Sequence, residues 1–262
     1  MAEADLSVRP TAREIFDRVL SDAEAEVDRP NAALALSGLA AGLTMGFTGL
    51  AVAAAFHAFG HGPWQSFAAY LLYPIGFIAV IVGRAQLFTE NTLYPVVLVL
   101  DRREFLGRTA QLWAIVFAAN VVGVIVFAAL VMKTPAAPPG LKHELVLLGD
   151  EAVRKSFAFA FWSGIVGGWL IALVAWLVEG TGGGMAMLAV IWILTFVVGL
   201  AGLAHCIATS AEIVAALLDG SSSVGSYARW LAGATLGNAF GGVVIVSLLN
   251  YGQVIAGSGH EA

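Results

Sequence analysis

Six long apolar stretches in succession constrain this chain more than any other feature. They cover about residues 31–59, 64–100, 105–132, 155–178, 185–218 and 227–251. A helix needs roughly 20 apolar residues to cross the hydrocarbon core of a bilayer. Only 12% of the residues are charged, whereas about 25% is usual for a soluble domain. The sequence therefore predicts an all-α membrane protein with six transmembrane helices.

The composition also excludes several classes of protein. The formal net charge of −5 offers no basic surface to a nucleic acid. The sequence has no phosphate-binding loop, zinc-protease motif or nucleophile elbow. We therefore expect no enzyme, no nucleic-acid partner, no cofactor and no metal. A single cysteine, Cys206, rules out an intrachain disulfide. His57 and His61 are spaced to bind a metal weakly, or are simply exposed to solvent.

Residues 1–30 differ from the rest of the chain, because they hold eight of its 18 acidic residues. Thr11 and Glu14 have the spacing of a capping box at the start of a helix. Apolar residues then follow at four-residue spacing: Ile15, Val19, Ala23 and Val27. This pattern predicts a cytoplasmic amphipathic helix. It is either a plug or partner helix at a pore mouth or, more ordinarily, a solvated helix lying against the bundle.

The second and fifth apolar stretches are each too long for one simple span, and polar residues interrupt both. The interruptions cover residues 83–91 and 199–212. Non-helical backbone at membrane depth is tolerated only where it is buried in protein or lines a cavity. Two interrupted segments at corresponding positions are a sequence indication of a transport site.

Short motifs repeat around these interruptions. Residues 37–42 contain Ser-Gly followed by a second glycine, and residues 163–168 contain the same pattern. Asn-Val-Val-Gly at 120–123 has a counterpart in Asn-Ala-Phe-Gly at 238–241. Three spans per repeat place the two repeats in opposite orientations across the membrane. The sequence therefore predicts an inverted 3+3 repeat with interrupted second and fifth helices.

Four ionisable residues fall at membrane depth, where charge is costly: Arg84, Glu90, His205 and Glu212. His205 can pass a proton to a weak-acid anion, or it is a core histidine bonded to a carbonyl. Arg84 and Glu90 contact a solute, or pair with each other in the loop. We expect Glu212 in water near a helix end.

Thr89 and the aromatic residues complete the candidates. The Thr89 hydroxyl could face His205 from the other interruption, or cap a half-helix. Tyr73, Phe77 and Phe88 could gate a pore, although such residues more often pack or face lipid.

Three motifs together resemble the formate/nitrite transporter family over residues 31–252. They are Leu-Phe-Thr at 87–89, Gly-x-x-His-x-x-Ala at 202–208 and Gly-Asn-x-x-Gly-Gly at 237–242. The resemblance implies an aquaporin-like inverted repeat of six spans and a homopentamer with one pore in each protomer. It also implies conduction of small monovalent anions such as formate, nitrite or hydrosulfide, often with a proton.

The resemblance implies roles for individual residues. His205 matches the central pore histidine, Thr89 the threonine that contacts it, and Asn238 an asparagine of the polar network. An outer constriction is implied at Phe88, Ile171 and Ala204, and an inner one at Tyr73, Phe77 and Val198. The chain has Gln86 where the family commonly has an acid, and added charges at Arg84 and Glu90. These departures resemble a divergent, YfdC-like branch.

We therefore expect a channel-like transporter of small weak-acid anions, linked to protons through His205 and reached from an electropositive vestibule. Its partners would be anions, protons, lipid and further copies of the chain. The alternatives are a non-conducting or tightly gated scaffold or sensor, and a neutral-solute pore. We expect a cytoplasmic helix in 1–30, a pore domain in 31–252 and a cytoplasmic tail in 253–262. Arg102 and Arg103 follow the second stretch, whereas no Lys or Arg follows the first, which places both termini in the cytoplasm. The resemblance implies a bacterial inner membrane.

Overall fold

The computed structural model describes residues 10–258, and all regular structure in that range is helical. The first half contains α1 (Ala12–Val27), α2 (Asn31–Phe59), α3 (Pro63–Tyr70), α4 (Ile75–Val82), η1 (Glu90–Thr92), α5 (Tyr94–Asp101), η2 (Arg103–Phe105) and α6 (Leu106–Lys133). The second contains α7 (Pro139–Arg154), α8 (Phe157–Thr181), α9 (Gly184–Leu200), α10 (Ala208–Asp219), α11 (Val224–Phe240), the π-helix η3 (Gly241–Leu248) and α12 (Leu249–Ser258).

Five helical stretches of the described chain are long and apolar enough to cross a membrane. They are Asn31–Phe59, Pro63–Val82, Arg103–Lys133, Phe157–Thr181 and Val224–Gly257. Gly184–Leu200 is apolar but shorter. The sequence predicts six spans. The difference lies in the fifth apolar stretch, which the chain divides between α9 and α10.

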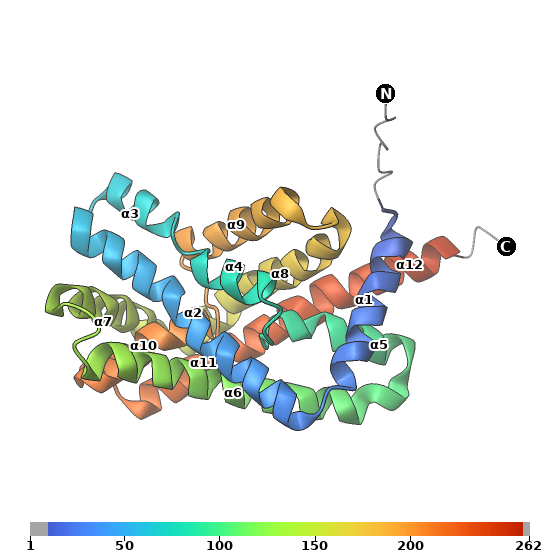
Figure 1. Ribbon diagram of the computed structural model, residues 1–262, viewed down its shortest axis with the longest axis horizontal. Helices are drawn as coiled ribbons and strands as arrows, with labels where there is room; N and C mark the ends of the chain where they lie inside the picture. Colours follow the sequence, from blue (N-terminus) through green and yellow to red (C-terminus); the bar gives the residue numbers. More distant parts are fainter. Residues whose placement is uncertain (1–9, 259–262) are drawn as a thin grey trace.

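The helices form an elongated bundle with different caps at its two ends. In Figure 1, α7 lies at one end, and α1, α5 and α12 lie at the other. Two long helix pairs, α2 with α6 and α8 with α11, are the most extensive packing contacts. In each pair, a glycine lets the two helices approach closely. A Cβ on Gly42 would lie 2.2 Å from the Asn120 carbonyl oxygen, and a Cβ on Gly168 would lie 2.2 Å from that of Asn238.

Helix α1 forms because its sequence caps and buries it. The Thr11 hydroxyl accepts a hydrogen bond from the Glu14 N–H, and the Glu14 carboxylate accepts one from the Thr11 N–H, which confirms the capping box. Hydrogen bonds from Thr11 lower the pKa of Glu14 below its usual value, and the bond from the Thr11 backbone has the largest effect. The buried face is Phe16, Val19, Ala23 and Val27. Ile15, expected on that face, is only partly buried.

The segment between α6 and α8 carries three prolines (Pro135, Pro138 and Pro139) and still forms a packed helix. Most of it forms α7, which begins with Pro139 in its first turn, where proline costs no helical hydrogen bond. Its buried face carries Leu145, Val146, Gly149 and Val153. This face packs on α10, where a Cβ on Gly149 would lie 2.1 Å from the Glu212 carbonyl oxygen.

The two ends of the described chain lie together. Phe16 of α1 and Tyr251 of α12 have ring centroids 5.9 Å apart. Helix α12 continues to Ser258, so the predicted tail begins inside a helix. Residues 1–9 and 259–262 lie outside the described range, and with them the first residues of the acidic segment and the last of the tail.

Candidate functional site

Both interruptions have the same backbone design. After α4, the N–H groups of Gly83 and Ala85 donate to the carbonyls of Ala79 and Val80 at 3.1 and 3.0 Å. After α9, the N–H groups of Ala201 and Leu203 donate to Val197 and Val198, each at 3.0 Å. Between these bonds, the backbone of each interruption turns at one residue with positive φ, 52° at Arg84 and 61° at Gly202. Glycine takes this conformation readily, whereas arginine adopts it at a steric cost.

Two buried asparagines hold the loops that follow. The Asn120 side chain accepts a hydrogen bond from the Phe88 N–H at 2.9 Å and donates to the carbonyls of Gly38 and Gln86. The Asn238 side chain makes the corresponding three bonds, from the Cys206 N–H at 2.8 Å and to the carbonyls of Gly164 and Ala204. Each asparagine thus ties a loop to two helices and satisfies backbone groups that water cannot reach.

The serines of the repeated motif match in the same way. The Ser37 hydroxyl accepts from the Gln86 N–H at 3.1 Å, and the Ser163 hydroxyl accepts from the Ala204 N–H at 3.4 Å. Ser37 and Gly38 match Ser163 and Gly164 at a shift of 126 positions, whereas the remaining loop contacts correspond when residues 79–120 are shifted by 118 positions along the chain. By that relation Leu87 corresponds to His205, and Tyr94 to Glu212.

The two loops meet at a buried pair in the centre. Thr89 Oγ1 and His205 Nε2 lie 2.9 Å apart, and both residues are fully buried. The Ala208 N–H donates to His205 Nδ1 at 3.1 Å. Since that bond occupies the Nδ1 lone pair, the neutral ring carries its proton on Nε2 and donates it to Thr89.

A series of aromatic rings leads away from this pair. The Phe77 ring meets the His205 ring edge-on, with centroids 5.0 Å apart. Tyr73 lies 5.7 Å from Phe77, and Tyr70 lies 6.5 Å from Tyr73. Phe77 is fully buried, so this series forms an apolar layer on one side of His205.

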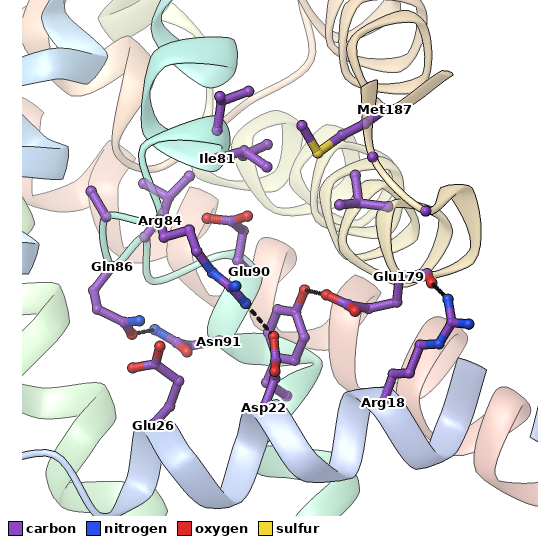
Figure 2. A pocket seen from close by; sticks show the side chains of 17 residues that line it. Arg18, Asp22, Glu26, Ile81, Arg84, Gln86, Glu90, Asn91, Glu179 and Met187 are labelled. Carbon is purple, nitrogen blue, oxygen red and sulfur yellow. Dashed lines mark hydrogen bonds and ion pairs between the residues drawn. The ribbon is translucent and has the colours of Figure 1, made fainter. Parts of the chain in front are cut away.

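A cavity of about 410 Å³ lies at the α1 end of the bundle. We call it the α1-side cavity; it is lined by Leu87, Tyr94, Met187 and charged residues of α1, the first loop and α8. Figure 2 shows Arg84 extending to Asp22 on α1, with Glu90 beside it. Arg84 Nη2 lies 2.5 Å from Asp22 Oδ2. The suggested pairing of Arg84 with Glu90 is therefore wrong, because α1 supplies a competing carboxylate.

The remaining polar contacts in this cavity leave it acidic. Gln86 accepts a hydrogen bond from the Asn91 side chain at 2.8 Å, and the Tyr94 hydroxyl donates to Glu179 at 3.0 Å. Four acidic residues line the cavity (Asp22, Glu26, Glu90 and Glu179), against two basic ones (Arg18 and Arg84). The expected electropositive vestibule is therefore not found at this end.

A second cavity, of about 70 Å³, lies at the α7 end. We call it the α7-side cavity. Its lining includes Tyr70, Tyr73, Lys155, Thr209 and Glu212. The expectation that Glu212 is in water at a helix end is wrong, since Glu212 lies in the second turn of α10 and is only 8% exposed.

The structure distributes the expected constriction residues differently from the two groups that the family resemblance implies. Tyr73, Val198 and Ala204 line the same α7-side cavity. Phe88 instead packs against Trp113 and Phe117 of α6, with centroids 5.6 and 5.0 Å away.

Ile171, expected at the outer constriction, and His61, a possible weak metal ligand, both have ordinary packing environments. Ile171 is fully buried in α8. His61 binds Glu144 at 2.9 Å and stacks on Phe56, and no group of metal-ligating side chains is found in residues 10–258.

Sequence reasoning did not find several residues that line the cavities. Asp22 and Glu179 lie far from the first loop along the chain, Tyr94 belongs to no motif, and Leu87 belongs to the Leu-Phe-Thr motif without an expected role of its own. The internal repeat could have predicted that Leu87 and Tyr94 line a cavity, because Leu87 corresponds to His205 and Tyr94 to Glu212.

The sequence and the fold of this chain are similar to those of several known proteins. A family model described as formate/nitrite transporter matches residues 13–252. The inner membrane protein YfdC of Escherichia coli (strain K12) is 30% identical over 246 residues, which are 93% of this chain and 79% of that protein. A solved structure of an FNT family ion channel covers 91% of this chain and 98% of its own, with a TM-score of 0.81 at 18% identity. A pentameric formate channel with formate bound covers 84% and 96%, with a TM-score of 0.71 at 18% identity.

Proposed function

Because the chain belongs to the formate/nitrite transporter family, on a YfdC-like branch, we propose that it forms a channel-like pore for small monovalent weak-acid anions. Transport is linked to protons through His205. The pore domain has six spans in an inverted 3+3 repeat, with the second and fifth interrupted. The protein is no enzyme.

The observation that carries this proposal is the Thr89–His205 pair at 2.9 Å between two cavities. An isolated anion cannot cross an apolar layer cheaply, because it loses its hydration. A solute that shares a proton crosses as a neutral acid. The Nε2–H group of His205 and the Thr89 hydroxyl then offer it hydrogen bonds at the centre.

Location and assembly are part of the proposal. The name of YfdC supports a bacterial inner membrane, and the pentameric formate channel supports a homopentamer and a formate-like solute. The packing of α1 against α12 favours both termini on one side. Arg84 joins Arg102 and Arg108 at that end, which favours the cytoplasm.

Flux into proteoliposomes tests the proposal. We expect the wild type to carry formate or nitrite, and His205→Ala to lower that flux at least about tenfold, because the solute loses its central donor. His57→Ala is the matched control, since His57 lies at the end of α2 against Gly140 and should keep wild-type flux. Equal flux of every small anion through wild type and His205→Ala would refute the proposal. Osmotic flux of neutral solutes that is insensitive to pH would favour the neutral-solute pore.

One observation favours a tightly gated form of the same pore. The ion pair between Arg84 and Asp22 joins the first loop to α1 beside the α1-side cavity. If this contact restricts access, Arg84→Gly raises anion flux over that of the wild type. An unchanged flux would remove the case for gating by this contact.

A further inference from the structure

The buried carboxyl group of Glu212 has no role in the function proposed above, and its surroundings are unusual. Gly49 of α2 makes room for it, since a Cβ there would lie 2.7 Å from Glu212 Cγ and 2.9 Å from Oε1. Its side chain lines the α7-side cavity together with Thr209, one turn earlier on the same face of α10.

Within residues 10–258, this carboxyl group has no hydrogen-bond or ion-pair partner, and its oxygens are open to the α7-side cavity rather than fully enclosed by protein. The groups that face it are Glu151 and Lys155 of α7 and the phenols of Tyr70 and Tyr73. Lys155 pairs with Glu151 at 3.4 Å instead. A buried carboxylate without a partner is costly, so cavity water or a solute must satisfy it, or it must hold a proton.

His205 serves a proton-linked path only if another group first delivers the proton, because both of its ring nitrogens are engaged in the structure. The Ala208 N–H occupies its Nδ1, so a second ring proton would break that bond. Loss of the Nε2 proton would leave an imidazolate anion among the buried rings of Phe77 and Tyr73. The proton therefore has to reach the solute before the solute passes this aromatic layer.

We propose that Glu212 is a proton-exchanging residue of the α7-side cavity, which protonates a small carboxylate or nitrite before the solute passes Tyr73 and Phe77. The O–H bond of the Glu212 carboxyl group breaks as a new O–H bond forms on the solute oxygen. Glu212 is left as a carboxylate, and a proton from the cavity water restores it. The reverse steps release the anion on this side. This inference rests on the proposed function.

The test uses the full-length protein in proteoliposomes that contain a pH-sensitive dye, with an inward formate gradient. The initial rate of internal acidification reports proton-linked formate flux, after subtraction of the rate in protein-free vesicles. We expect Glu212→Gln to lower this rate at least about tenfold at pH 7, since general acid–base groups contribute roughly 100-fold or more to proton transfer. The loss should be smaller at pH 5, where the solution itself supplies more undissociated acid.

Two variants separate proton exchange from a structural role. Glu212→Asp keeps a carboxyl group and should keep most of the rate. Asp219→Asn removes the same charge from the exposed end of the same helix, outside the lining of the α7-side cavity, and should change the rate no more than about twofold. Size-exclusion chromatography checks that each variant assembles like the wild type.

The outcomes are distinct. A wild-type rate for Glu212→Gln overturns the inference and leaves the proposed function intact. Equal losses for Glu212→Gln and Glu212→Asp, with normal assembly, assign Glu212 a packing role and also overturn it. If the wild type carries neither formate nor nitrite, the proposed function fails, and this inference fails with it.

Discussion

The two interrupted regions of this molecule share a backbone frame and differ in the chemistry placed on it. Asn120 and Asn238 make corresponding sets of three hydrogen bonds. Corresponding glycines let the adjacent helices approach equally closely. The frame is therefore maintained in both halves.

The side chains at matched positions show the difference. The first loop has Arg84 where the second has Gly202, and Leu87 where the second has His205. On the helices that follow, Tyr94 corresponds to Glu212. The first loop is thus built to bind α1, and the second to place titratable groups in the interior. The two copies of a repeat can therefore hold their backbones in the same way while their side chains carry different chemistry.

The largest effects are expected from the asparagines, and they test whether the frame is truly shared. Asn120→Ala and Asn238→Ala each leave one buried N–H and two carbonyls without their partner. We expect each to destabilise the protein by about 3 kcal/mol or more. Thermal unfolding followed by tryptophan fluorescence would measure this. A large loss for one variant and none for the other would show that the two loops are not held in the same way.

Smaller effects are expected from the paired glycines. Gly42→Ala and Gly168→Ala would each force a methyl group against a backbone carbonyl. We expect similar losses of about 1–3 kcal/mol in the same unfolding measurement. Gly107→Ala is the control, because no atom lies within 4 Å of a Cβ there and alanine favours a helix. Destabilisation by Gly107→Ala as large as that of the pair would show that the losses do not come from close approach.

The smallest effect on stability is expected at Arg84, where the two halves differ most. Arg84→Gly gives the first loop the residue of the second, relieving a positive φ while removing an exposed ion pair. The two terms oppose each other, so the free energy of unfolding should change by less than about 1 kcal/mol. Hydrogen exchange in α1 should nevertheless become faster, by less than about tenfold, because other contacts keep α1 in place.

Those other contacts also define the control for the Arg84 experiment. Arg102 pairs with Glu24, Arg108 pairs with Asp28, and Phe16 is buried. Exchange in α6 and α8 should therefore stay unchanged in Arg84→Gly. Unchanged exchange in α1 would show that the first loop does not contribute to holding this helix.

Much of the fold could be predicted because its causes are local. Apolar length predicts helices, and the capping box predicts the start of α1. The Ser-Gly and Asn motifs predict the hydrogen bonds that hold the two loops, because each copy contacts the loop of its own half. The pairing of Thr89 with His205 follows from one long-range assumption, that the two interruptions face each other.

The remaining features depend on partners far apart in the sequence. Asp22 is 62 residues from Arg84, so only the packed position of α1 makes it a better partner than Glu90. The polar neighbours of Glu212 in the sequence predict a position near water, but α7 and Gly49 cover it in the fold. Composition could not predict α7 as a packed helix, because its burial depends on α10.

The aromatic layer beside His205 has an electrical consequence. Cavities filled with water would bring the potential of each bulk solution close to the centre and would concentrate the membrane field over the thin apolar layer of Tyr73 and Phe77. A unit charge crossing there would experience most of the transmembrane voltage, about 2.3 kcal/mol per 100 mV. An acid that crosses without charge is independent of that voltage. The current–voltage relation of this protein is therefore a direct measure of the charge carried by the permeating species.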